Sequence, residues 1–204
     1  FLAHPLELNG FKEYPMEIAE VASMAMELMS MEEWETFFSD KEDLKRAKEH
    51  QLERVITIFP WIAIIDKFQH WVYEHPVHTH VERTAAWNEI LKEFQDDAID
   101  YSGLEEFRSN GWLRQLHLFE VPFYYIEYGI AQLGALAVWK NYKENPATAL
   151  ENYKKALSLG STCTIPEVYQ AARISFSFEQ SYIRELALFV SKELEKLNDQ
   201  QDRA

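Results

Sequence analysis

The segment PMEIAEVASMAMEL, residues 15–28, is predicted to form an amphipathic helix that carries two closely spaced acidic residues. Glu17 and Glu20 lie three residues apart, so on a helix both carboxylates project from nearly the same face. The neighbours of Glu20 are apolar, and a carboxylate among apolar side chains needs a cation, a metal ion or hydrogen-bond donors. The sequence pattern alone does not choose among these partners for Glu20. The alternative is an ordinary helix with acids in its first turn, where the helix dipole favours them.

A second stretch combines an imidazole with several phenols. His117 precedes Tyr124, Tyr125 and Tyr128, and Pro122 predicts a helix start just before the tyrosines. Spacings of three and four residues would place Tyr128 on the same helix face as Tyr125 or Tyr124. Hydroxyl and imidazole groups that face a cleft could donate hydrogen bonds to a developing oxyanion.

The same stretch also fits ordinary core packing. An aromatic stripe most simply packs inside a core, and we expect Phe119, Phe123 and Trp139 to do so. Gly129 and Gly134 carry no side chain, so they would let another helix approach closely. Two explanations therefore stay open for the tyrosines: a donor cluster that faces a cleft, or an aromatic stripe buried in the core.

Helices must position these residues, because strand-like alternation is nearly absent from the chain. Only 6 glycines and 7 prolines interrupt its 204 residues. We predict an all-α fold, an irregular arrangement of helices with no substantial sheet. The expected helices cover residues 15–30, 31–38, 41–73, 81–95, 104–110, 146–159, 166–172 and 178–197, and one more begins at Pro122.

The composition argues against several classes of function. A formal net charge of −14 disfavours binding to nucleic acid and to anionic membranes. Two apolar runs are candidates for membrane spans. Residues 55–65 are too short to cross a bilayer. Residues 118–139 are long enough but contain Glu120 and Glu127, so a buried core helix is expected there instead. Cys163 is the only cysteine, so no intrachain disulfide forms, and a reducing, cytoplasmic location is expected.

Other metal sites have less support in the sequence. His70, His75, His78 and His80 fall within eleven positions, but no two of them are four residues apart. A helix end, where the dipole favours histidine, explains them better. A ferritin-like carboxylate site needs Glu-x-x-His pairs, and no histidine of this chain has Glu three residues before it.

Both chemical stretches resemble one known family. PMEIAEVASMAMEL is similar to the segment after the zinc-binding HExxH helix in oligoendopeptidase F and other thimet-oligopeptidase-like zinc metallopeptidases, which implies that Glu20 is the third zinc ligand. HLFEVPFYYIEYGIAQLGAL resembles the family segment that lines the cleft opposite the zinc. By this resemblance His117 matches the family histidine and Tyr128 is the main oxyanion-side tyrosine. Tyr124 or Tyr125 is expected to be the second.

The chain departs from the family pattern in one important respect. No histidine is followed by Glu, so HExxH is absent, and only 19 residues precede Glu20. We expect residues 1–204 to be the C-terminal part of a catalytic domain whose missing N-terminal part carries two histidine ligands of the Zn²⁺ ion and the general-base Glu. The implied protein is a zinc metalloendopeptidase that hydrolyses short peptides, and this chain alone is expected to be inactive.

A fragment without its packing partner should expose apolar surface, and we expect this around Met24 or Ile130. The alternative from another class of function is a noncatalytic helical interaction or ligand-binding module. The coding sequence upstream of Phe1 separates the two hypotheses. An HExxH motif there supports the peptidase, and a start codon there supports the module.

Overall fold

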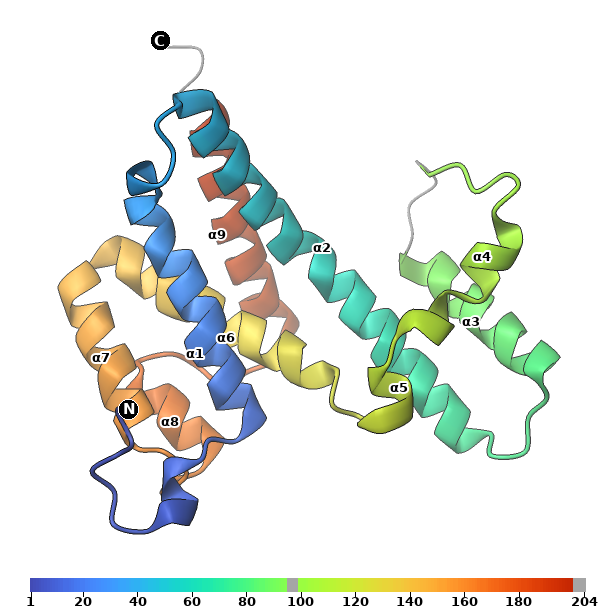
Figure 1. Cartoon of the computed structure of the whole chain (residues 1–204), viewed down its shortest axis with the longest axis horizontal. Helices are drawn as coiled ribbons and strands as arrows, with labels where there is room; N and C mark the ends of the chain where they lie inside the picture. The colour runs from blue at the N-terminus through green and yellow to red at the C-terminus, as the bar shows by residue number, and fades with distance from the viewer. Residues whose placement is uncertain (95–98, 200–204) are drawn as a thin grey trace. The chain divides into compact units, whose positions relative to one another are not determined.

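The computed structural model describes residues 1–94 and 99–199, and every regular element within them is helical (Figure 1). The all-α prediction is therefore confirmed. The α-helices are α1 (Met16–Ser30), α2 (Lys41–Glu74), α3 (His80–Phe94), α4 (Glu105–Ser109), α5 (His117–Glu120), α6 (Ile126–Glu144), α7 (Pro146–Ser158), α8 (Ile165–Ala171) and α9 (Gln180–Asp199). The 3₁₀ helices are η1 (Asn9–Lys12), η2 (Met31–Thr36) and η3 (Gly111–Arg114). None of the described helices has the length and apolar character that a bilayer span requires.

The chain divides into two compact units. Unit 1 consists of Phe1–Ile56 and Ile130–Ala204, and unit 2 consists of Thr57–Gly129. Helices α2 and α6 contribute residues to both units. The expectation that residues 1–204 form the C-terminal part of a catalytic domain stays a prediction.

Helix α1 packs into unit 1 through one apolar face. Its buried residues are Ile18, Val21, Ala25, Leu28 and Met29. Most of them are three or four positions apart, which is the spacing of a single helix face. Helix α1 contacts α8, and α8 contacts α7. The Tyr153 hydroxyl of α7 also donates a hydrogen bond of 2.7 Å to the Ala22 carbonyl of α1.

Gly134 of α6 allows two other helices of unit 1 to approach closely. A Cβ atom at Gly134 would lie 2.6 Å from the Tyr169 hydroxyl oxygen of α8 and 2.9 Å from Val21 Cγ2 of α1. The same Tyr169 hydroxyl donates a hydrogen bond of 3.2 Å to the Ile130 carbonyl. The predicted role of Gly134 is therefore confirmed.

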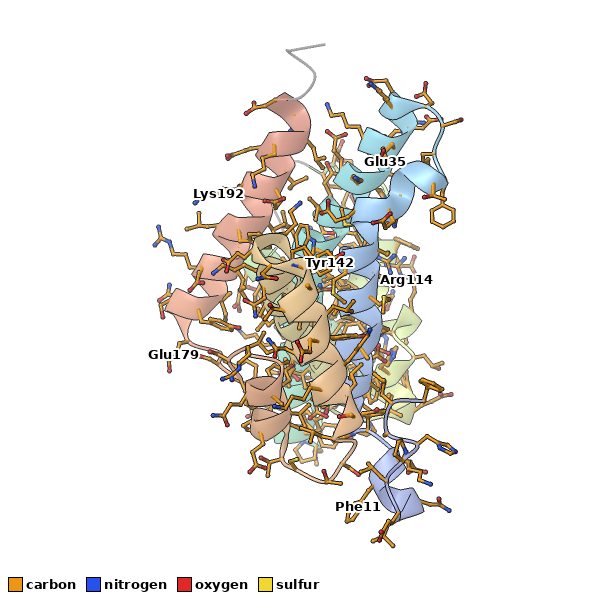
Figure 2. The ribbon with its side chains drawn as sticks, turned by 90° about the vertical axis from the view of Figure 1, so that its left-hand side faces the viewer. Phe11, Glu35, Arg114, Tyr142, Glu179 and Lys192 are labelled. Atoms are coloured by element: carbon orange, nitrogen blue, oxygen red, sulfur yellow. The ribbon has the colours of Figure 1, made fainter. Side chains whose placement is uncertain are left out.

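Gly160 allows the N-terminal segment of unit 1 to lie against the loop that precedes α8. Its φ of +55° lies in the left-handed region, and a Cβ there would meet the Phe11 carbonyl oxygen at 1.9 Å. The Ser161 N–H donates to that carbonyl at 3.0 Å, and the Ser161 hydroxyl donates to the Gly10 carbonyl at 3.0 Å. Figure 2 labels Phe11 in this segment, which contains the short η1.

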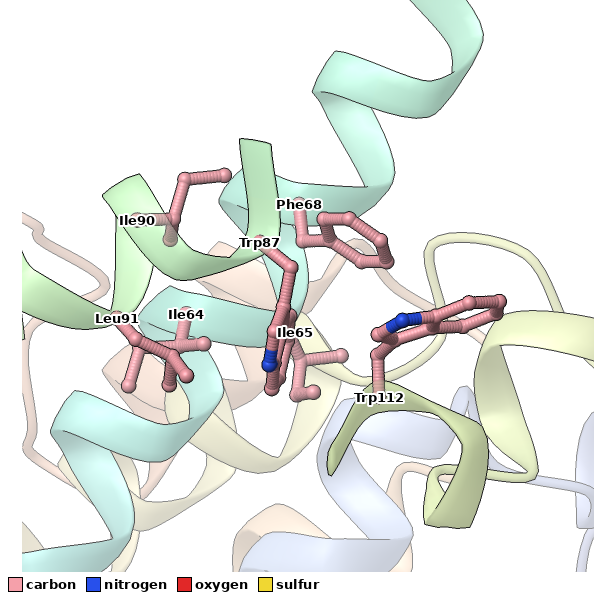
Figure 3. Packing of buried hydrophobic residues seen from close by; sticks show 7 residues of the cluster. All are labelled: Ile64, Ile65, Phe68, Trp87, Ile90, Leu91 and Trp112. Carbon is pink, nitrogen blue, oxygen red and sulfur yellow. The ribbon is translucent and has the colours of Figure 1, made fainter. Parts of the chain in front are cut away.

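Unit 2 is built on a cluster of aromatic and aliphatic side chains. Figure 3 shows its buried members, Ile64, Ile65, Phe68, Trp87, Ile90, Leu91 and Trp112. Trp87 of α3 is 1% exposed, and the rings of Phe68 and Trp61 from α2 meet it edge-on with centroids 5.0 and 6.0 Å away. The Trp87 indole donates a hydrogen bond of 3.0 Å to the Arg108 carbonyl. Helix α2 continues through Pro60 into this cluster.

The structure corrects two predictions for the stretch after His117. Helix α6 begins at Ile126 rather than at Pro122, because Phe123 adopts a φ of 60° that no right-handed helix contains. The predicted burial of Phe119 is wrong, since its side chain is 55% exposed. Trp139 is buried as predicted.

The two residues around which exposed apolar surface was predicted, Met24 and Ile130, are not themselves exposed. Met24 and Ile130 are both half-buried, whereas Met26 of α1 is exposed. The helix that was expected to reach Gln95 is observed to Phe94. Gln95 and the following residues 96–98 lie outside the described residues.

Replacement of Gly134 by alanine should destabilise the chain. The added methyl group must displace the Tyr169 ring and Val21, and such overpacking costs about 1–3 kcal/mol of unfolding free energy. Urea unfolding followed by circular dichroism measures this loss. Gly10→Ala is the matched control, because a Cβ at Gly10 meets no atom within 4 Å. An equal effect of the two variants would contradict the prediction.

Candidate functional site

A tight turn between α5 and α6 brings tyrosine side chains back to His117. Phe123 adopts a φ of 60°, a left-handed conformation that costs a non-glycine residue about 1 kcal/mol or more. Its backbone N–H donates a hydrogen bond of 3.0 Å to the side-chain oxygen of Gln69 on α2, and this contact holds the turn. Tyr124 and Tyr125 therefore lie before the helix and not on its face, contrary to the prediction.

Three tyrosine rings contact the imidazole of His117. The centroid of Tyr124 lies 5.8 Å from that of His117 in a stacked arrangement, and Tyr125 and Tyr128 meet the imidazole edge-on at 4.9 and 5.7 Å. The Tyr128 ring is also 5.4 Å from the rings of Tyr124 and Tyr125. All four side chains are half-buried. The structure thus brings these residues together in what we call the His117 cluster, and their catalytic role stays a prediction.

Two residues that the sequence did not single out extend the His117 cluster by hydrogen bonds. Trp61 Nε1 donates to Gln115 Oε1 at 3.2 Å, and Gln115 Nε2 lies 2.6 Å from His117 Nδ1. On the other side of the ring, His117 Nε2 lies 3.4 Å from the Tyr128 hydroxyl oxygen. Gln115 could have been found by its place two residues before His117. Trp61 could not, because it lies 54 positions before Gln115.

Burial raises the pKa of the Tyr125 phenol above its ordinary value. A hydrogen bond with Trp61 lowers this pKa, and the neighbouring Tyr128 phenol raises it further. The Tyr125 phenol is therefore protonated at neutral pH and can donate a hydrogen bond.

Glu20 lies on α1 in unit 1 with a half-buried side chain. The Ser23 hydroxyl is 3.4 Å from its Oε2 and 3.0 Å from its backbone carbonyl oxygen, so the carboxylate keeps lone pairs that a metal ion could accept. Across residues 1–94 and 99–199, no three His, Cys, Asp or Glu residues are grouped to hold a metal ion. Because Glu20 belongs to unit 1 and the His117 cluster to unit 2, a cleft shared by the two stays a prediction.

The histidines that follow α2 make structural contacts. Helix α2 ends at Glu74, close to the predicted helix end at residue 73. The His75 ring stacks on Trp71 with centroids 4.6 Å apart. His78 Nε2 accepts a hydrogen bond of 2.7 Å from Arg83 Nε. These contacts agree with the structural explanation of the histidine-rich segment.

Comparison with known proteins gives a consistent result over most of the chain. The sequence profile of Peptidase family M3 matches residues 3–188. The chain is 27% identical over 161 residues to an oligoendopeptidase F homolog from Borreliella burgdorferi, covering 76% of this chain and 26% of that protein. The structure of a candidate oligoendopeptidase F matches with a TM-score of 0.83 and 30% identity, covering 95% of this chain and 34% of that one. For PZ peptidase A with an inhibitor, the TM-score is 0.84, the identity 30%, and the coverage 98% and 35%.

The chain therefore spans about a quarter of the length of the curated relative and about a third of the solved structures.

The raised pKa of Tyr125 predicts how stability depends on pH. Between the pKa of an unfolded tyrosine, about 10, and the higher folded value, the unfolded chain loses the phenol proton first, so stability falls as the pH rises. Tyr125→Phe should therefore lose less stability than the unaltered chain between about pH 9 and about pH 11. Urea unfolding at both pH values measures the difference, with Tyr142→Phe as the control. An equal alkaline loss in Tyr125→Phe and the unaltered chain would refute the prediction.

Proposed function

Because the chain belongs to Peptidase family M3, a family of zinc metallopeptidases, we propose that it forms part of the catalytic domain of an endopeptidase that hydrolyses short peptides. The chain spans about a third of the length of the solved structures that it matches, so the rest of the domain comes from a part outside these 204 residues. In this proposal, that part carries the HExxH motif.

The observation that carries the proposal is the packing of three phenols around His117. His117 Nε2 and the Tyr128 hydroxyl oxygen lie 3.4 Å apart, so one carbonyl oxygen of a bound peptide can reach both groups. Both donate a hydrogen bond to this oxygen as negative charge develops on it, and Tyr124 or Tyr125 supplies a further phenol. Donors that are already oriented stabilise the transition state more than the substrate.

Ring packing prepares these donors before the peptide binds. The edge-on and stacked contacts restrict rotation of the imidazole and the phenols, and partial burial reduces competition from water. Electrostatic stabilisation is larger in such a setting than in bulk water. The side chains therefore do not need to reorganise when the charge of the carbonyl oxygen changes.

Glu20 is the proposed metal ligand of this chain. Within the part of the chain that the structure describes, no Lys or Arg forms an ion pair with its carboxylate, and the contact with Ser23 leaves acceptor positions available. A catalytic zinc site has three protein ligands and one open position, so Glu20 alone does not complete it. When bound, the metal supplies an activated water and polarises the peptide carbonyl.

The partners follow from the same proposal. The substrates are short peptides, and the N-terminal part of the same protein supplies two histidine ligands and the general base. The acidic charge of −14 argues against nucleic acid and anionic membranes as partners, and a cytoplasmic location remains the expectation. The chain by itself is inactive and binds Zn²⁺ weakly or not at all, because it holds one ligand of three.

Removal of the Tyr128 hydroxyl tests the oxyanion role. In the enzyme that contains the complete domain, Tyr128→Phe keeps the ring contacts and should lower kcat for peptide cleavage by about 10²–10³. The KM and the bound zinc should change little, because the phenol acts mainly in the transition state. Tyr142→Phe, a change on α6 at a residue that Figure 2 labels, is the control. An unchanged kcat in Tyr128→Phe would remove this residue from the catalytic machinery.

The metal role of Glu20 is tested in the same enzyme by Glu20→Gln. The neutral amide is a poorer ligand for Zn²⁺, so the variant should lose most of its zinc and its peptide cleavage. Metal analysis of the purified protein and a peptide assay measure the two losses. Glu27→Gln, an exposed change on the same helix, should retain both. If Glu20→Gln also retained zinc and activity, Glu20 would not be a ligand, and the noncatalytic alternative would gain support.

A further inference from the structure

We propose that Gln115 and Trp61 are positioning residues that hold His117 in the tautomer with its proton on Nε2, so that the imidazole and Tyr128 both act as donors. The inference rests on the proposed function for its catalytic meaning. Its structural content, the place of one proton, can be measured without any reaction.

The tautomer follows from the donor and acceptor properties of the three side chains. An indole N–H can only donate, so the Gln115 atom that lies 3.2 Å from Trp61 Nε1 must be the oxygen. The amide nitrogen of Gln115 then faces His117 Nδ1 at 2.6 Å and donates to it. In a neutral imidazole one nitrogen accepts and the other carries the proton, so the proton lies on Nε2.

Hydrogen-bond donation continues in the same direction from His117 to Tyr128. The Nε2–H of His117 points to the Tyr128 hydroxyl oxygen at 3.4 Å, a long contact that a substrate oxygen can replace. The hydroxyl oxygen acts as acceptor in that contact, so its own proton remains available for another acceptor. Trp61, Gln115 and His117 therefore each donate to the next side chain, and this series of three hydrogen bonds ends at Tyr128, whose O–H can donate to a ligand.

The apolar core of unit 2 sets the orientation of Trp61. Its ring meets the Trp87 ring edge-on at an interplanar angle of 86° and a centroid distance of 6.0 Å. Trp87 is itself fixed by Phe68 and by its hydrogen bond to the Arg108 carbonyl. The direction of the Trp61 N–H is thus set by packing, and Gln115 transmits it to His117.

The opposite tautomer would be harmful to the proposed reaction. With the proton on Nδ1, Nε2 would direct a lone pair at the carbonyl oxygen and would repel the charge that develops there. A histidine that is held in the wrong tautomer by its hydrogen-bond partner loses much of its catalytic effect, as in triads of serine proteases. Gln115 and Trp61 prevent this because they leave Nδ1 only the acceptor role.

The test is nitrogen NMR of the histidine side chains in the full 204-residue chain at alkaline pH. Protonated and unprotonated imidazole nitrogens have well-separated ¹⁵N shifts, and the spectrum of His117→Phe identifies the signals of His117. We expect the proton on Nε2 in the unaltered chain. A proton on Nδ1, or an equal mixture of tautomers, would overturn the proposal without the need for any variant.

Two variants test the cause of the tautomer. Gln115→Glu replaces the donor with a carboxylate that can only accept, so the proton should move to Nδ1. Trp61→Phe keeps an aromatic ring and removes the N–H, so the Gln115 amide can turn over and the shifts should move toward averaged values. Gln170→Glu makes the same charge change at an exposed site on α8 and should leave His117 unaffected. Unchanged His117 shifts in Gln115→Glu or Trp61→Phe would refute the role of that residue.

Catalysis gives an independent readout in the enzyme with the complete domain. Gln115→Glu should lower kcat by about 10²-fold or more, with a smaller change in KM, because the donor is misdirected rather than removed. A tautomer change without a loss of kcat would overturn the positioning role. If the NMR results hold and Tyr128→Phe has no effect on kcat, the proposed oxyanion role of Tyr128 fails while the tautomer assignment stands.

Discussion

The hydrogen bond from the Trp61 indole to Gln115 joins the apolar core of unit 2 to its polar cluster. Since an indole can only donate, this one contact determines the direction of the hydrogen bonds that follow it. The orientation of the Gln115 amide and the position of the proton on His117 both depend on this contact. A packing contact between two tryptophan rings therefore decides which atoms of the cluster can donate to a ligand.

A second constraint lies in the turn that precedes α6. The left-handed conformation of Phe123 is unfavourable by itself, and several contacts of unit 2 compensate for it. Its N–H binds Gln69, and its ring packs on His70 and Tyr73 with centroid distances of 5.0 Å in both cases. This strained turn directs the two tyrosines after it toward His117. Local strain thus contributes to the arrangement that the proposed chemistry uses.

The sequence predicted those features that depend on local pattern. Helical periodicity and few interruptions were sufficient for the all-α fold, and α1 begins within one residue of the predicted start at Pro15. The resemblance to oligoendopeptidase F is confirmed by the match to Peptidase family M3. Contacts between distant residues were not predictable in the same way. The conformation of Phe123 depends on Gln69, and the orientation of Gln115 depends on Trp61, in each case a partner 54 positions away.

The central claim is that Glu20 and the His117 cluster act on the same peptide bond. A crystal structure of the protein with the complete domain, zinc and a phosphinic peptide that mimics the tetrahedral transition state is the most direct measurement. We predict a Glu20 carboxylate oxygen on the zinc and one phosphinate oxygen within about 2.7–3.1 Å of both His117 Nε2 and the Tyr128 hydroxyl. A Glu20 side chain directed into solvent, or a packed layer between it and the His117 cluster, would contradict the claim.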